Sequence, residues 1–476
     1  MLTELGRVTD EPGQLTRTFL SPAMRRANRL VGSWMRAAGL TVREDAVGNL
    51  IGRLEASPTA GLTRISLDVV ESGSFSSLNP NETLTSSATT SHRRLNRTSV
   101  SSLGAIGRHP TKTLLLGSHL DTVRNAGKYD GPLGVLLPIV ALGELRRRGV
   151  KLPFHVEVIG FSEEEGVRFS SAYLGSKGYC EKLTATDLTR RDADGISVRE
   201  ALAEWNGPAS GRAGQRLGAS ALHLKASNPT SNLLGYTGVL PKPTHVTSNL
   251  LGYVEVHIEQ GPVLEAKRLA VGVVSAIAGQ SRFTLTWTGR AGHAGTTPMT
   301  LRRDALAGVA EFALGVEAVA RRTRGLVATI GVLSIPSGAA NVIPARVVHT
   351  LDVRHASNRV RRTALREIGR LAARIARRRR LIRTWRRTQE NGAVSCSPAL
   401  TARLSRSVKA VQGRTRALVS GAGHDAVVVS ALTPVAMLFV RCRGGLSHHP
   451  DEYAAPADLG VALRVIADFL QRLAND

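Results

Sequence analysis

A histidine directly follows an apolar run in GSHLDTVRNAGKYDG, and two aspartates follow it closely. His119 lies two residues before Asp121 and eleven before Asp130. A metal-bound imidazole needs an acceptor for its second ring nitrogen, and the His-x-Asp spacing supplies one. Asp130 can reach the same site from the loop. The alternative for this segment alone is a surface loop of ordinary polar residues.

Three adjacent carboxylates, Glu163, Glu164 and Glu165, follow the apolar run VEVIGF. They repel one another unless water or cations neutralise them. In a catalytic site, one carboxylate binds a metal ion while its neighbour acts as a general base toward water. The alternative is a solvated run of charge, and these residues alone leave both interpretations open.

Two further histidines lie in or just after apolar runs. His257 lies in VEVHIEQGP, and His448 lies in the segment Ser447-His448-His449-Pro450 after MLFV. Imidazoles and carboxylates at four such positions fit a dinuclear zinc-type site better than four coincidences. No G-x-S-x-G elbow occurs near a histidine and an aspartate, which disfavours serine hydrolysis. No phosphate-binding loop of the Walker type occurs either.

The apolar runs that position these residues predict strands of an α/β fold. Residues 113–117, 156–161 and 254–258 are rich in strand formers, and helical patterns separate them. This alternation predicts a mostly parallel central sheet flanked by helices, with functional residues at the carboxyl ends of the strands. Residues 21–39 predict an amphipathic helix that Ser21 caps.

The pattern changes between residues 277 and 391, where a ferredoxin-like α+β domain is predicted. The α/β pattern resumes after it. We therefore expect a catalytic domain of residues 1–276 and 392–476, interrupted by a lid and dimerisation domain at 277–391. The elements expected in the lid are a strand at 281–289, a helix at 301–321, strands at 326–335 and 346–355, a helix at 358–378 and a last strand near 381–387.

Two segments are foreign to this plan. Residues 57–110 are rich in Ser, Thr and Asn and have little periodicity, which predicts a disordered surface insertion. The heptapeptide TSNLLGY occurs at 230–236 and again at 247–253, which indicates a tandem duplication rather than a repeat fold. The arginine run at 376–387 predicts a solvent-exposed helix face and the segment in which the chain leaves that helix.

The composition is globular with a strong basic excess. The 476 residues include 63 Lys and Arg against 37 Asp and Glu, a net charge of +26. Such a surface attracts anions. Aromatic residues make up only 4% of the chain and do not interleave with the basic stretches, which disfavours nucleic acid as a partner.

Three scattered cysteines, Cys180, Cys396 and Cys442, form no CxxC pair, which excludes a disulfide framework and a thiolate zinc site. No apolar run approaches membrane-spanning length, and no signal peptide is visible. We therefore expect a cytoplasmic protein with no membrane partner.

Seven motifs together resemble the hydantoinase/carbamoylase-type amidases. That family includes allantoate amidohydrolases, N-carbamoyl-L-amino-acid hydrolases and β-ureidopropionases, within the dizinc aminoacylase and peptidase superfamily. The resemblance covers nearly the whole chain apart from the two foreign segments. The motifs are GSHLDTVRNAGKYDGPLGVL, FSEEEGVRF, GYVEVHIEQGPVLE, GRAGHAGTTPMTLRRDA, NVIPARVVHTLDVRH, SGAGHDA and FVRCRGGLSHHPDEY.

The resemblance implies two divalent metal ions per subunit, with zinc expected and manganese, nickel or cobalt as alternatives. Asp130 matches the aspartate that bridges both metals. In the SHHP motif, the family spacing selects His448 over His449. The other matches are His119 and His257 for the first metal, Glu165 and His448 for the second, Asp121 for the aspartate that orients the first histidine, and Glu164 for the general base.

The resemblance also implies substrate contacts. His293 matches a histidine that stabilises the oxyanion from the partner subunit, which implies a homodimer. Asn341 and Arg354 match residues that grip the substrate carboxylate, and the arginine fork suits that duty. Gln260 matches a further substrate contact. His424 and Asp425 match a motif near the metals, with a supporting or structural role.

These matches predict a metal-dependent amidohydrolase that cleaves the ureido C–N bond of a small carboxylate and releases ammonia and carbon dioxide. Allantoate and N-carbamoyl-L-amino acids are the expected substrates. Three alternatives stay open: an aminoacylase or dipeptidase of the same superfamily, a basic nucleic-acid-binding protein, and an inactive relative whose insertions spoil the site.

Overall fold

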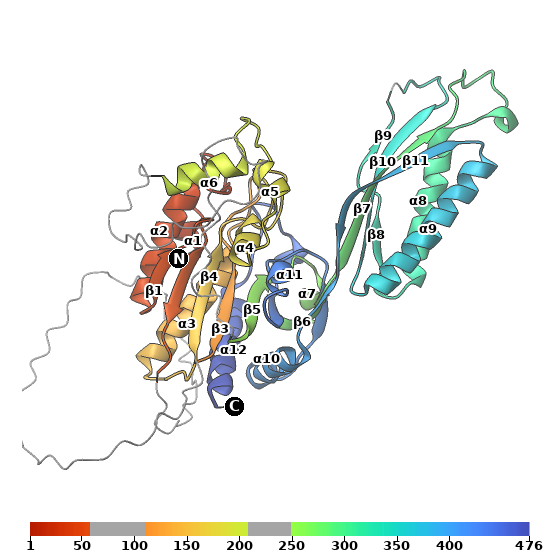
Figure 1. The fold of residues 1–476 in the computed structure, drawn as a ribbon. Coiled ribbons are helices and arrows are strands. Elements are labelled where there is room, and N and C mark those ends of the chain that lie inside the picture. Colours follow the sequence, from red (N-terminus) through yellow and green to blue (C-terminus); the bar gives the residue numbers. More distant parts are fainter. Residues whose placement is uncertain (58–110, 208–248, 337, 476) are drawn as a thin grey trace, which may run out of the picture.

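The computed structural model describes residues 1–57, 111–207, 249–336 and 338–475. Its larger sheet runs in the order β1-β2-β4-β3-β5-β14-β6-β12, with β13 beside β6 (Figure 1). The middle strands β4, β3, β5 and β14 are parallel, and β2 and β6 flank them antiparallel. The prediction of a mostly parallel central sheet is confirmed. The strands are β1 (Thr41–Glu44), β2 (Leu50–Leu54), β3 (Thr113–His119), β4 (His155–Phe161), β5 (Leu250–Ile258), β6 (Val271–Ile277), β12 (Val394–Ser395), β13 (Ala417–Ser420) and β14 (Val435–Val440).

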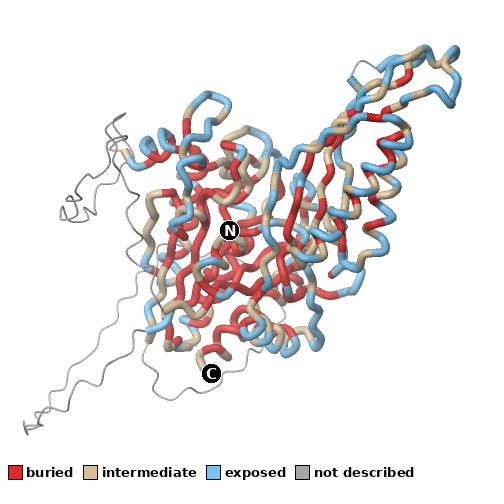
Figure 2. Tube along the Cα trace, turned by 45° about the vertical axis from the view of Figure 1, so that its right-hand side comes forward, coloured by how far each residue is buried: buried red, intermediate tan, exposed pale blue. Residues whose placement is uncertain are grey.

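Alternate side chains of the middle strands enter two cores, one on each face of this sheet. Leu114 and Leu116 of β3 pack with α2, α3, α10 and α12, whereas Leu115 packs on the other face with α4, α7 and α11. Figure 2 shows these strands as the buried centre of the molecule. The helices are α1 (Leu2–Leu5), α2 (Pro22–Ala37), α3 (Pro132–Arg147), α4 (Leu174–Tyr179), α5 (Ala185–Thr189), α6 (Val198–Asn206), α7 (Val263–Ala266), α10 (Pro398–Gln412), α11 (Ala426–Val429) and α12 (Pro456–Asn475).

A second, antiparallel sheet is inserted between β6 and β12 and has its own core. Its order is β11-β7-β10-β8, with β9 beside β10. Helices α8 and α9 supply the rest of this core, in which Trp287 and Phe312 are buried. The ferredoxin-like prediction is confirmed, with the strand predicted at 326–335 divided into β8 and β9, which both pair with β10. The elements are β7 (Gly279–Thr288), α8 (Ala305–Arg322), β8 (Val327–Thr329), β9 (Leu333–Ser334), β10 (Arg346–His355), α9 (Asn358–Arg378) and β11 (Ile382–Asn391).

Several element boundaries differ from the sequence expectation. The helix expected from residue 301 begins at Ala305, because Met299–Leu301 form a 3-10 turn and the Asp304 carboxylate caps the helix by accepting from Ala307 N at 3.0 Å. The last strand of this second domain, β11, extends to Asn391 rather than 387. The helix at 21–39 is confirmed as α2, with Ser21 as its cap.

The insertion predicted at 57–110 lies, from residue 58 on, outside the described residues, and so does the first TSNLLGY copy. The end of the second copy forms the start of β5. None of the helices in the described part of the chain has both the length and the apolarity needed to cross a bilayer.

Candidate metal centre

The residues expected to bind metal meet at the carboxyl edge of the parallel strands. His119 ends β3, Glu163–Glu165 follow β4, His257 lies one residue before the end of β5, and His448 lies beyond β14. Because these strands are parallel neighbours, their ends bring the groups to one place. His119, His257 and the nearby Asp130 are buried, whereas the His448 side chain is half exposed.

Asp130 lies between two sets of groups. Its Oδ1 is 3.5 Å from His119 Nε2 and 3.0 Å from His257 Nε2. Its Oδ2 is 3.3 Å from His448 Nε2, and that nitrogen is 3.7 Å from Glu165 Oε1. Each carboxylate oxygen therefore faces a different pair of candidate ligands.

The rings of His119 and His257 are oriented through their Nδ1 atoms. Nδ1 of His119 is 3.0 Å from the carbonyl oxygen of Asp121 and 3.3 Å from its Oδ1, and Nδ1 of His257 is 2.9 Å from the carbonyl oxygen of Ile258. Since carbonyl oxygens only accept, both Nδ1 atoms are donors and both Nε2 atoms keep a lone pair in the neutral ring. Gly131, at φ 82°, leaves room for the His119 ring, because a Cβ there would lie 2.4 Å from it.

Backbone contacts distinguish the three adjacent glutamates. The Asp121 carboxylate accepts hydrogen bonds from Glu164 N at 3.0 Å and Glu165 N at 3.1 Å. The Glu163 carboxylate accepts from the backbone of Gly166 and from Leu174 N. The Glu163 carboxylate therefore holds the backbone of its own loop. The carboxylates of Glu164 and Glu165 make no such backbone contacts in the described structure and face the cluster.

Three overlapping groups of side chains can hold a cation. The groups are His119, Asp130 and His257; His119, Glu164 and Glu165; and Asp130, Glu165 and His448, with the ligand atoms of each group within 4.8 Å of one another. Imidazole nitrogens and carboxylate oxygens are the ligand types that zinc and related divalent metals take in proteins.

The electrostatics of this cluster favour added positive charge. Burial and the adjacent Glu165 raise the pKa of Glu164 well above its ordinary value. Burial and the charge of Asp130 raise the pKa of Glu165 to about 7. Burial alone would raise the pKa of Asp130. The neighbouring His257 and His119 outweigh burial and hold that pKa well below its ordinary value. Cations relieve such crowding, so the donor set fits divalent metal ions.

Three side chains support Asp130, and the sequence motifs assigned a role to only one of them, Gln260. Gln260 Nε2 donates to Asp130 Oδ2 at 2.8 Å, while its buried Oε1 has no partner among the described residues. Ser447 Oγ lies 2.7 Å from Asp130 Oδ2 and 2.9 Å from Glu452 Oε2. Glu452 Oε1 accepts from the backbone N of Tyr129 and Asp130. Ser447 and Glu452 lie close to His448 in the sequence SHHPDE, and this closeness was the only sequence feature that could have pointed to their role.

His424 and Asp425 lie beneath the same cluster. The His424 ring is 4.6 Å from the His257 ring, and its Nε2 is 2.7 Å from Ser420 Oγ. Asp425 is fully buried, and burial together with the charge of Glu255 raises its pKa well above the ordinary value. Both residues therefore pack against the cluster from the second core.

The lid residues expected to contact substrate do not bond to this cluster in the described part of the chain. His293 and Asn341 lie side by side, since Ala294 N donates to the Asn341 carbonyl at 2.8 Å. The exposed His293 ring accepts at Nδ1 from the backbone N–H groups of Gly295 and Thr296. In a neutral ring the proton is therefore on Nε2, which leaves a hydrogen-bond donor facing outward.

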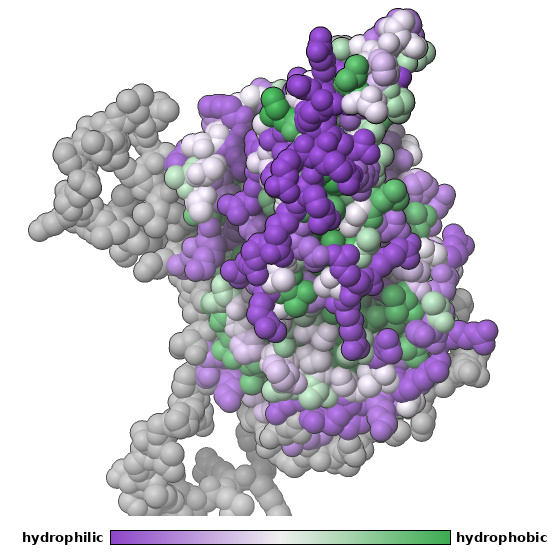
Figure 3. Space-filling view, turned by 90° about the vertical axis from the view of Figure 1, so that its right-hand side faces the viewer, coloured by the Kyte–Doolittle hydropathy of each residue, from purple (hydrophilic) through white to green (hydrophobic). Residues whose placement is uncertain are grey.

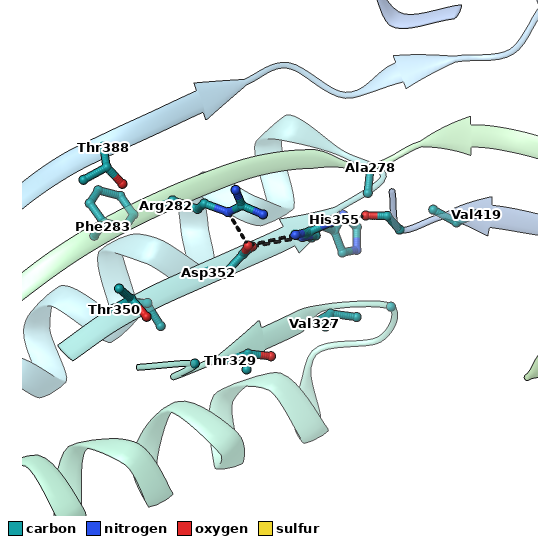
Figure 4. Close-up of a pocket in the computed structure, with 15 residues that line it drawn as sticks. Ala278, Arg282, Phe283, Val327, Thr329, Thr350, Asp352, His355, Thr388 and Val419 are labelled. Carbon is teal, nitrogen blue, oxygen red and sulfur yellow. Dashed lines mark hydrogen bonds and ion pairs between the residues drawn. The ribbon is translucent and has the colours of Figure 1, made fainter. Parts of the chain in front are cut away.

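Arg354 lines a different pocket, of about 600 Å³, between the second sheet and the strand β13. Its guanidinium binds Asp352 in a bidentate manner and donates to the Gly421 carbonyl at 2.6 Å. Figure 4 shows Arg282 pointing at the same Asp352, which it contacts at 2.7 Å. No member of the His119 cluster lines this pocket.

Comparisons with known proteins agree on one family. Residues 115–472 match the peptidase family M20/M25/M40. The chain is 36% identical to a probable allantoate deiminase of Oryza sativa subsp. japonica, covering 100% of this chain and 88% of the relative. It is 35% identical to an N-carbamoyl-L-amino acid amidohydrolase of Geobacillus stearothermophilus, covering 100% and 97%.

A solved structure of an amidase of the hydantoinase/carbamoylase family from Burkholderia multivorans matches the fold. The TM-score is 0.77 at 26% identity, and the match covers 100% of this chain and 96% of that one. The crystal structure of AtUAH in complex with glyoxylate matches with a TM-score of 0.66 at 27% identity, covering 100% of this chain and 96% of that one. The chain therefore belongs to the metal-dependent hydrolases of peptidase family M20/M25/M40 and, within them, to the hydantoinase/carbamoylase-type amidases.

Proposed function

We propose that the protein hydrolyses the ureido C–N bond of a small carboxylate at a two-metal centre, with allantoate or an N-carbamoyl-L-amino acid as substrate. The single observation that carries this proposal is Asp130, whose two oxygens face two different sets of ligands. The names of the relatives, which include allantoate deiminases and N-carbamoyl-L-amino acid amidohydrolases, support the substrate class.

The chain's own residues divide the ligand duties. His119 and His257 would hold one ion, Glu165 and His448 the other, and Asp130 both; zinc suits these donors, with manganese, nickel and cobalt as alternatives. When bound, divalent ions supply Lewis acidity and lower the pKa of water in the site toward neutrality. Asp121 fixes the position of the His119 ring relative to the backbone of Glu164 and Glu165, because its carboxylate contacts all three.

Glu164 is the general base in this proposal. Its carboxylate accepts a proton from the attacking water, and the oxygen adds to the ureido carbon. Glu164 then returns the proton to the leaving nitrogen as the C–N bond breaks. The carbamate product decomposes to ammonia and carbon dioxide. The contacts of the Glu163 carboxylate to backbone N–H groups support Glu164 rather than Glu163 in this role.

Side chains of the lid recognise the substrate. His293, with a donor at Nε2, stabilises the oxyanion that develops at the ureido carbon. Asn341 and Arg354 bind the substrate carboxylate, which must displace Asp352 from the arginine fork. Gln260 contributes its unpartnered buried Oε1, an acceptor for a ureido N–H.

We further propose that residues 277–391 form a lid and dimerisation domain, and that His293 serves the active site of the partner subunit. One edge of the second sheet is suited to a self-contact, because among the described strands β8 and β9 pair with β10 alone, and both carry exposed apolar side chains. The opposite edge, β11, bears several arginines and would repel a copy of itself. The exposed apolar residues in and beside β8 and β9 are Val327, Val332 and Leu333.

An ammonia-release assay tests the function. The metal-loaded protein is incubated with allantoate, several N-carbamoyl-L-amino acids, N-carbamoyl-β-alanine and, as a control, N-acetyl-amino acids and dipeptides. We expect ammonia only from ureido substrates. Release of an acyl acid or of free amino acids from the controls would instead identify an aminoacylase or dipeptidase.

Subunit mixing tests the dimer. Glu164→Gln and His293→Ala are each expected to be inactive, but a heterodimer would contain one site with both lesions and one with neither. Random mixing should recover about a quarter of the wild-type activity for a symmetric dimer. No recovery after confirmed subunit exchange would place His293 in its own subunit's site or outside catalysis.

A further inference from the structure

Tyr173 lies against the general base of the proposed site. It is the residue before α4, and its backbone N donates to the Glu164 carbonyl oxygen at 3.2 Å. Its φ of 69° is left-handed, a conformation that a bulky residue adopts only when its surroundings impose it. The backbone around Tyr173 is therefore fixed to the loop that carries Glu164.

A glycine makes room for the phenol group. A Cβ at Gly423 would lie 1.9 Å from the Tyr173 hydroxyl oxygen and 3.6 Å from Glu164 Oε1. The hydroxyl and the carboxylate thus border the same glycine. Any larger residue at position 423 would push the phenol away from Glu164.

The hydroxyl is a neutral donor that has no hydrogen-bond partner among the described residues. Burial and the charge of Glu164 raise the pKa of Tyr173 well above its ordinary value, so the group keeps its proton at working pH. The Tyr173 side chain is only partly buried. A protonated hydroxyl beside a catalytic carboxylate, not committed to that carboxylate, is available to a ligand.

We propose that Tyr173 is a catalytic residue whose hydroxyl donates a hydrogen bond to the oxygen of the ureido group that is being hydrolysed. This inference rests on the proposed function, because it takes Glu164 as the base. A ureido carbon attacked by water at Glu164 must lie within a few ångströms of that carboxylate, where the phenol ends. Negative charge develops on the ureido oxygen during the attack, and a fixed neutral donor stabilises it without ionising.

The Tyr173→Phe variant tests the role of the hydroxyl alone. We expect kcat to fall about 100-fold, as for the loss of one oxyanion donor, with KM little changed. Metal content and the melting temperature should match the wild type, since the ring and the backbone contacts remain. A kcat within about twofold of the wild type would overturn the inference. Wild-type protein that releases no ammonia from any ureido carboxylate would overturn the proposed function itself.

The Gly423→Ala variant tests the same contact from the other side, and the double variant with Tyr173→Phe is its matched control. The added methyl collides with the hydroxyl, so this variant should lose about as much kcat as Tyr173→Phe. In the double variant the 1.9 Å contact with the hydroxyl oxygen is removed, and the nearest remaining phenyl carbon, 3.2 Å from the methyl, needs to shift by only a few tenths of an ångström. The double variant should therefore be no slower than either single one. Losses that multiply in the double variant would show that the two positions act independently and would overturn the geometry of the inference.

Discussion

Two regions of the molecule, the candidate metal centre and the helix α9, each concentrate charge of one sign, but only the first is buried. In the metal centre, acidic side chains crowd at the strand ends, and Asp130, Glu163 and Glu164 are nearly inaccessible to water. On α9, one exposed stripe carries arginines with no ion-pair partner among the described residues. We call this stripe the arginine face; it consists of Arg359, Arg362, Arg366, Arg370, Arg374 and Arg377.

The two regions differ in whether solvent and salt can screen their charges. Figure 3 shows hydrophilic side chains gathered over the side of the molecule that α9 faces. Water and salt screen exposed charges within about 10 Å at moderate ionic strength, so the arginine face costs little. Buried carboxylates have no such screen, and the pKa values of Glu164 and Glu165 are raised accordingly. Excess charge therefore indicates a ligand-binding site where it is buried, and mainly a solvated surface where it is exposed.

The largest expected effect separates two adjacent members of the buried cluster. Glu164→Gln should lower turnover about 10²- to 10⁴-fold while metal is retained, because a carboxamide cannot accept the proton of water. Glu165→Ala should lose metal as well as activity, since a ligand is deleted. Elemental analysis and ammonia release measure both. Substantial activity in Glu164→Gln would show that the base is elsewhere.

The second effect is the pH dependence of stability in metal-free protein. Glu165 has an ordinary pKa of 4.5 and a folded pKa of about 7, so the folded state binds more protons between these values. Stability should therefore fall as pH rises from about 5 to about 7. His448, whose folded pKa is raised to about 9, mainly by its contact with Asp130, continues the loss from about 6.5 to 9. Denaturant melts in the presence of a chelator measure this slope.

Two controls sharpen the pH test. Restoring zinc should flatten the slope, because a bound cation replaces the protons. Metal-free Glu165→Gln should flatten the lower part of the slope, since the side chain no longer titrates. A wild-type protein whose metal-free stability is constant between pH 5 and 8 would contradict the view that these carboxylates repel one another.

Much of the metal centre was predictable because its residues follow recognisable strands. A histidine at the end of TLLLGSH and glutamates after VEVIGF must meet if the strands are parallel neighbours, and they do. The ferredoxin-like domain was predictable for a similar reason, since its strands and helices alternate with clear periods. The pattern did not assign a task to each glutamate, because Glu163 is distinguished only by its contacts to Gly166 and Leu174.

Contacts between distant segments could not be predicted from local patterns. Ser447 and Glu452 support Asp130 across more than 300 residues of chain, and no spacing rule links them. In the sequence, Tyr173 is an ordinary aromatic residue before a short helix. Its closeness to Gly423 and Glu164 is visible only in the structure. The start of α8 was missed because Asp304 was not recognised as its cap. These features depend on tertiary packing, which periodicity does not encode.

The smallest expected effect concerns the arginine face itself. Like charges three or four residues apart on a helix cost about 0.2–0.5 kcal/mol per pair. Replacing Arg366, Arg370 and Arg374 with glutamine, which is also a good helix former, removes the central repulsions. The free energy of unfolding should then rise by about 1–2 kcal/mol at low salt, the sum over four neighbouring pairs.

A matched control distinguishes local repulsion from net charge. Arg346, Arg386 and Arg416 are exposed and lie outside any helix, so replacing these three with glutamine changes the net charge equally without touching α9. We expect the stabilisation only in the α9 variant, and we expect it to vanish near 1 M salt, where the screening length is about 3 Å. Ammonia release should be unchanged in both variants, because the arginine face does not contact the metal centre in the described structure. Destabilisation of the α9 variant, or equal stabilisation of the control, would mean that these arginines are held by interactions beyond simple exposure to solvent.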